Sequence, residues 1–158
     1  MKFKNKKTGE VVDFSPCLIN SALLSAQNRQ RYYWANWEFT QPEDRGIVLA
    51  DIIECDLVDR DDVVIMQRAR GYNAGGIKAK DGKTPTLSAN AWEHNNHLVV
   101  NSHYRKLTPR ECFRLQTVPE HYIDKILDCG VSNSTLYKIA GNGWTDEVIA
   151  HILRCAKF

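Results

Sequence analysis

Residues 27–34 read Gln-Asn-Arg-Gln-Arg-Tyr-Tyr-Trp and carry two arginines two positions apart, Arg29 and Arg31. Apolar stretches accompany this block: CLINSALL occupies 17–24, and RYYWA occupies 31–35. Both stretches are typical of short β-strands, and the polar SAQNRQ between them is typical of a turn. Side chains at i and i+2 of such a segment project to one side. The block therefore predicts a strand pair that presents two guanidinium groups together, suited to two neighbouring acceptors.

The composition is that of an ordinary globular chain: of 158 residues, 43% are hydrophobic and 25% are charged. No apolar run approaches the ~20 residues of a membrane span, and the basic N-terminus lacks the apolar segment of a secretory signal. The five cysteines are scattered and form no CxxC pair, and His94 and His97 lack partners at ligand spacing. We therefore expect a cytoplasmic protein with no membrane span, no disulfide framework and no metal.

Positive charge gathers in residues 66–84. The basic residues there are Arg68, Arg70, Lys78, Lys80 and Lys83, against Asp81 alone. Such a cluster predicts a local nucleic-acid surface, although on charge alone a solvated basic loop is an equal alternative.

The middle of the chain predicts short strands joined by a long loop. A strand is expected at 63–67 (VVIMQ), followed by a glycine-rich loop in which a regular element is not expected. Further short strands are expected at 84–89 and 97–100, whereas 45–58 fits either a helix turn or pieces of strand.

The last third predicts helices. Thr108-Pro109-Arg110-Glu111 is a capping box with proline at the first helical position, and Cys112, Leu115 and Val118 give the helix that follows one buried stripe. Residues 145–156 predict a second helix with Thr145 as its cap. Its expected buried residues are Val148, Ile149, Ile152 and Leu153.

Three separated motifs resemble one family, in that family's order. Residues 27–34 resemble motif VIII of the DNA cytosine-C5 methyltransferases, and residues 105–111 resemble motif IX. Residues 141–144, Gly-Asn-Gly-Trp before a helix, resemble motif X. Thr86-Leu87 lies between motifs VIII and IX, as in the family's recognition domains. Trp144, together with the Tyr-Tyr-Trp run after the arginines, looks most similar to phage-borne enzymes and the animal de novo methyltransferases.

The resemblance implies an α/β fold: the C-terminal part of a Rossmann-like, S-adenosylmethionine-dependent methyltransferase with a small, mostly-β target-recognition domain. It divides the chain into three parts. Residues 1–36 are a lead-in and the motif VIII strand pair, 37–122 are the target-recognition region ending in motif IX, and 123–158 return to the methyltransferase domain.

The resemblance also implies roles for individual residues. Arg31 donates to O2 of a flipped cytosine, while Arg29 supports the site or a phosphate. Asn142, Gly143 and Trp144 form part of an S-adenosylmethionine site, although a core position for Trp144 is an alternative. The residues expected at double-stranded DNA are Arg70, Lys78, Lys83, Thr86, Asn90 and Trp92.

The family's catalytic cysteine, glycine loop and Glu-Asn-Val motif have no counterpart here. Pro16-Cys17 is a tempting substitute for the Pro-Cys motif, but it falls in the lead-in to motif VIII and reads as a buried strand residue. The chain alone is therefore expected to be inactive. It can be the smaller subunit of a split bacterial or phage enzyme, a truncated enzyme or remnant, or, from another class, a non-catalytic DNA-binding module.

An apolar strand pair without sheet neighbours needs a cover. We therefore expect a homodimer or an N-terminal methyltransferase subunit as partner, with residues 17–24 or 148–153 in the contact.

Overall fold

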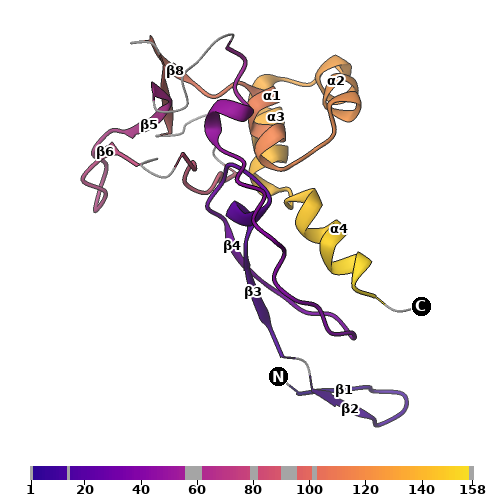
Figure 1. Ribbon diagram of the computed structural model, residues 1–158. Helices are drawn as coiled ribbons and strands as arrows, with labels where there is room; N and C mark the ends of the chain where they lie inside the picture. Colours follow the sequence, from indigo (N-terminus) through magenta and orange to yellow (C-terminus); the bar gives the residue numbers. More distant parts are fainter. Residues whose placement is uncertain are drawn as a thin grey trace.

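The computed structural model describes residues 2–13, 15–55, 62–78, 82–89, 96–100 and 103–156. Within this part, strands and loops make up the first two thirds and four α-helices make up the last third (Figure 1). The mixture of strands and helices agrees with the predicted α/β content. No helix among these residues is long and apolar enough to cross a membrane.

The described strands form three antiparallel sheets. β1 (Lys2–Lys4) pairs with β2 (Val11–Asp13), and β3 (Cys17–Asn20) pairs with β4 (Gln30–Tyr33). The third sheet has the order β6-β5-β7-β8. Its strands are β5 (Val64–Gln67), β6 (Gly76–Ile77), β7 (His97–Val100) and β8 (His103–Lys106). In Figure 1 the β1–β2 hairpin lies at one end of the molecule and the four-stranded sheet at the other.

The predicted strand pair at motif VIII is confirmed, but its first strand is shorter than predicted. β3 ends at Asn20 and a 3-10 turn, Ser21–Leu23, follows. The turn forms because Asn20 Oδ1 accepts the backbone N–H groups of Ala22 at 3.1 Å and of Arg29 at 2.9 Å. This side-chain cap offers the backbone an alternative to further strand pairing.

Of the central strands, those predicted at 63–67 and 97–100 are confirmed, whereas 84–89 is not a strand. The Thr84 backbone is hydrogen-bonded to residues 26–28. Its N–H donates to Ala26 O at 2.7 Å, and its carbonyl accepts Asn28 N–H at 2.8 Å. The next bond comes from a side chain, because Leu87 N–H donates to Gln27 Oε1 at 2.8 Å. The glycine-rich loop, in contrast, contains the two-residue strand β6, and residues 45–58 contain a 3-10 turn at Leu49–Asp51.

The predicted capping box is confirmed at α1 (Pro109–Leu115). Thr108 Oγ1 accepts Glu111 N–H at 3.2 Å, and Glu111 Oε2 accepts Thr108 N–H at 2.7 Å. Cys112 and Leu115 are buried as predicted, and Val118 packs half-buried against the same core.

The C-terminal helix α4 (Asp146–Arg154) differs from prediction in two ways. Thr145 precedes it but makes no side-chain cap; its buried hydroxyl is hydrogen-bonded to Ser21 Oγ at 2.8 Å and to Gln116 Oε1 at 3.1 Å. Val148 and Ile152 are buried, whereas Ile149 is half-buried and Leu153 is 52% exposed. The helix therefore carries an uncovered apolar edge.

Two apolar clusters hold the chain together. The larger one packs the four-stranded sheet against α1, α2 (Glu120–Asp128) and α3 (Asn133–Asn142). The smaller one packs α4 against β3 and β4, through Ile19, Val148 and Ile152. The expected boundary between residues 122 and 123 stays a prediction; in the structure it lies within α2, whose Ile123 belongs to the larger cluster.

Candidate functional site

Arg29 joins three segments that are far apart in the sequence. It is 5% exposed, and its guanidinium donates to the carbonyl of Leu87 at 2.8 Å, of Gly141 at 3.2 Å and of Gly143 at 2.9 Å. Burial, and then the nearby charge of Arg31, lowers the pKa of Arg29 from its ordinary value. Three carbonyl acceptors pair with the donors of the buried cation and so offset the cost of its burial.

Further contacts strengthen the same junction. Thr86 Oγ1 donates to the carbonyl of Asn28 at 2.5 Å, so the Thr86-Leu87 pair lies directly against motif VIII. Gly141 packs so closely on the backbone of Ser88 that a Cβ at this position would collide with the Ser88 carbonyl. A glycine inside a helix is unfavourable by itself, and this close approach explains why it stands here. The sequence contained this glycine as a signal, but its contact was not predictable.

Arg31 lies on β4 beside an open hollow of about 550 Å³. Unlike Arg29, Arg31 is exposed, and the hydrogen bond that its guanidinium makes is to the carbonyl of the adjacent Gln30 at 2.7 Å. We call the space the aromatic hollow. It is lined by Arg29, Arg31, Tyr32, Tyr33, Trp34, Ala35, Trp37, Asn142, Trp144, Ile149, Ile152 and Leu153.

Two residues of the motif X turn, Asn142 and Trp144, also line the aromatic hollow. Asn142 is the last residue of α3, Gly143 follows it in an extended conformation, and Trp144 precedes Thr145 and α4. Trp144 is 67% exposed, so the core position considered for it is wrong. The turn thus presents an amide and an indole to the hollow that Arg31 borders.

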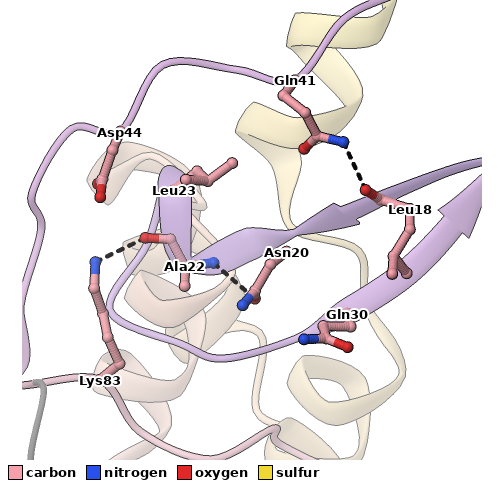
Figure 2. Close-up of a pocket in the computed structure, with 8 residues that line it drawn as sticks. All are labelled: Leu18, Asn20, Ala22, Leu23, Gln30, Gln41, Asp44 and Lys83. Carbon is pink, nitrogen blue, oxygen red and sulfur yellow. Dashed lines mark hydrogen bonds between the residues drawn. The ribbon is translucent and has the colours of Figure 1, made fainter.

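Lys83 is not placed to meet DNA, which corrects the prediction that it neutralises a phosphate. It is 9% exposed, and its ammonium donates to the carbonyls of Ala22 at 2.7 Å, Ser25 at 3.1 Å and Ile47 at 2.5 Å. Figure 2 shows this side chain among the residues that line a second hollow, with its nitrogen directed at the Ala22 carbonyl. Charge alone could not distinguish this internal lysine from an exposed one.

Apart from Thr86, the remaining residues that were expected at DNA fall into two groups. Arg70 and Lys78 are exposed on the loop that joins β5 to β6 and the segment that follows it. Asn90 and Trp92, and with them His94, lie outside the described residues. Among the described residues, no group of three or more His, Cys, Asp or Glu side chains is placed to hold a metal ion.

The sequence profile of the C-5 cytosine-specific DNA methylases matches residues 19–157. The chain belongs to this family. Its relatives include the orphan methyltransferase M.Rho11sI of Bacillus phage rho11s, which is 39% identical over 84 residues, 50% of this chain and 16% of that protein. The type II methyltransferase M.Bsp6I of Bacillus sp. (strain RFL6) is 33% identical over 159 residues, 80% of this chain and 48% of that protein. The resemblance to phage-type enzymes is confirmed.

The chain spans less than half the length of the C-5 methylase relatives it matches. The family match begins at residue 19 and therefore excludes the β1–β2 hairpin.

None of the five cysteines of this C-5 methylase chain lines the aromatic hollow. Cys17 is half-buried in β3 rather than fully buried as predicted, and its sulfur accepts the Gln41 amide at 3.4 Å. Cys112 is buried in α1, where burial raises the pKa of its thiol. A methylase nucleophile needs an exposed thiol, and neither residue offers one.

Proposed function

We propose that this chain is the target-recognition and C-terminal part of a DNA (cytosine-5-)-methyltransferase, and that it acts together with a segment carrying the catalytic cysteine. The observation that carries the proposal is the Arg29 junction. One buried guanidinium links motif VIII to the Thr86-Leu87 segment and to the motif X turn, and residues of motif VIII and of that turn line one hollow. The family membership of residues 19–157 supports it.

In this proposal Arg31 recognises the target base. A cytosine that has been flipped out of the duplex must be read by fixed donors, and a guanidinium supplies them. Arg31 is exposed at the aromatic hollow. Its hydrogen bond to the Gln30 carbonyl uses one of the five N–H donors of the guanidinium. Arg29 is a positioning residue, because its hydrogen bonds connect motif VIII to Leu87 and to the motif X turn.

The motif X turn suits part of an S-adenosylmethionine site. Asn142 offers amide hydrogen bonds and Trp144 an exposed aromatic face, and both line the hollow next to Arg31. S-adenosylmethionine supplies an activated methyl group when bound. Because the glycine loop for its methionine end is absent from the sequence, we propose a partial site here.

The proposed DNA surface consists of Arg70, Lys78 and Thr86, with Asn90 and Trp92 beside them in sequence. The first two are exposed cations that can neutralise phosphates. Residues 37–122 would then contain the recognition region, and the strand pair and α4 would belong to the methyltransferase domain.

A methyl-transfer assay with radiolabelled S-adenosylmethionine and DNA tests the proposal. The chain alone should transfer no methyl group, and adding a chain with the glycine loop and the Pro-Cys motif from the same genome should produce 5-methylcytosine. Arg31→Ala should then abolish most of the activity, since a charged hydrogen bond worth ~1.5–3 kcal/mol is lost. Cys17→Ser is the control and should leave the activity unchanged.

Each other outcome has a distinct meaning. Methylation by the isolated chain, or its loss in Cys17→Ser, would show that the nucleophile lies in this chain. If DNA binding persists but no partner restores transfer, the chain is a non-catalytic DNA-binding module or an inactive remnant.

A further inference from the structure

Three cationic or protonatable side chains lie together on the outward face of the four-stranded sheet: Arg68, His97 and Lys106. Ile65, Leu98 and Val100 point into the core, so alternation along the strands directs Met66 and His97 to the other face. Met66 lies opposite His97 on the neighbouring strand, and His97 lies opposite Lys106. Three adjacent strands therefore place their side chains in one row across this face.

Tyr104 contacts two of these three side chains, His97 and Arg68. Its ring stacks on His97 with 4.6 Å between ring centroids and 20° between ring planes. The Arg68 guanidinium carbon lies 5.7 Å from the centroid of the same ring, and Arg68 Nε donates to the Tyr104 hydroxyl at 3.2 Å. Arg68 and His97 are thus held against one aromatic side chain, beside Lys106.

No residue of β5, β7 or β8 is acidic. Several cations held close together on a surface attract an anion more strongly than one cation does. Arg, Lys, His and Tyr side chains are all suitable donors for phosphate oxygens. Arg68 follows β5 directly and precedes Arg70 by two residues, so this face is continuous with the exposed basic loop.

We propose that Arg68, His97 and Lys106, which we call the cationic cluster, bind a backbone phosphate of duplex DNA, and that the affinity rises as the pH falls because His97 is protonated in the complex. The inference rests on the proposed function for the identity of the anion. It adds a contact on the sheet face, away from the aromatic hollow.

The electrostatics of His97 agree with this coupling. Burial, then Arg68, then Lys106 lower the pKa of His97 from its ordinary value. The groups that face it are Arg68 beyond β5, and Tyr104 and Lys106 on β8. Free His97 is consequently neutral near pH 7. A phosphate beside it favours the imidazolium form, so binding takes up a proton, and acidification strengthens binding.

The test uses the whole chain and a short labelled DNA duplex, with affinity measured by fluorescence anisotropy across salt and pH. The paired variant Arg68→Gln/Lys106→Gln should reduce the slope of log affinity against log salt by about one unit per lost phosphate contact. Lys138→Gln, an exposed lysine on α3, is the matched control and should keep the wild-type slope. Circular dichroism melting should show that all variants fold.

The dependence of DNA affinity on pH tests the contribution of His97 by itself. Between about pH 7.5 and about pH 5.5 the wild-type affinity should increase, by at most tenfold per unit for one linked proton, and His97→Gln should lose this increase. A His97 pKa measured by NMR should rise when the duplex is added. If the wild-type chain binds DNA but the paired variant keeps the salt slope, or His97→Gln keeps the pH dependence, the phosphate contact at the cationic cluster is wrong. The proposed function would then be unaffected. Absence of DNA binding by the wild-type chain would overturn both the cluster and the proposed DNA substrate.

Discussion

Arg29 and Arg31 stand two positions apart in one motif, yet they occupy opposite environments. The Arg29 guanidinium is buried and satisfied by three backbone carbonyls, whereas Arg31 is exposed at the rim of the aromatic hollow. A buried cation is tolerated only when its donors are paired, and the loss of such a group leaves its acceptors without partners. The two arginines therefore have separable effects on stability and on function.

Replacing Arg29 with methionine should destabilise the protein strongly. The carbonyls of Leu87, Gly141 and Gly143 would lose their donor, and we expect the free energy of unfolding to fall by about 3 kcal/mol. Arg31→Met is the matched control, because it removes the same side chain from an exposed position, and it should change stability by less than about 0.5 kcal/mol. Urea denaturation, monitored by circular dichroism, measures the free energy of unfolding of the two variants. Equal losses for the two variants would contradict the division of roles.

At the scale of elements, the start of α1 is held by a network that extends beyond its capping box. Glu111 is fully buried; its carboxylate accepts Arg105 at 2.6 and 2.8 Å and the backbone N–H of Glu54 at 2.8 Å. Side-chain hydrogen bonds to Glu111 raise the pKa of Arg105. Thr108 also donates to Glu54 Oε2 at 2.5 Å. The helix terminus thus ties β8 and the segment after the Leu49–Asp51 turn to the helical core.

Thr108→Ala should lower the free energy of unfolding by about 1 kcal/mol, the usual cost of losing an N-cap hydroxyl. The reason is that Glu111 N–H would lose its side-chain acceptor at the first turn of α1. Thr40→Ala, in an exposed loop, removes the same atoms without a cap and should be neutral. Thermal and urea denaturation give the comparison, and a neutral Thr108→Ala would mean that proline and Glu111 suffice to start the helix.

At the scale of the whole molecule, the smaller apolar cluster is incompletely covered. α4 packs on one face of β3 and β4, while Tyr32, Trp34, Trp144 and Leu153 keep between 48% and 67% of their surface exposed. These residues lie together in the aromatic hollow. A contiguous exposed apolar surface of this kind is typical of an interface.

We therefore expect the chain to self-associate or to bind a complementing methyltransferase segment through this surface. Leu153→Glu should weaken the association while leaving the melting temperature nearly unchanged, because Leu153 is 52% exposed at the edge of α4. Val131→Glu, at a 39% exposed position outside the hollow, is the control. Sedimentation velocity across a concentration series measures association, and a monomer at all concentrations without a partner segment would exclude the homodimer.

The elements that the sequence predicted well are those decided by local interactions. The capping box of α1, the strand β5 and the strand pair of motif VIII depend on neighbouring residues, and each is confirmed. The family motifs could also be recognised in the sequence, because each one is a short continuous stretch. The failures lie where a distant partner decided the outcome: residues 84–89 bond to residues 26–28 instead of forming a strand, and Thr145 bonds to Ser21 and Gln116 instead of capping α4.

The sequence by itself determined the family, the order of its motifs and the absence of a Pro-Cys nucleophile outside the motif VIII lead-in. Only the tertiary structure decided which polar groups face inward. Lys83 and Arg29 read as surface cations in the sequence, but each is buried against three backbone carbonyls. The reason is physical: a carbonyl without a strand or helix partner must find a donor, and the donor that reaches it comes from a segment that is remote in sequence. Burial and partnership of this kind depend on the folded chain as a whole, so no local pattern contains them.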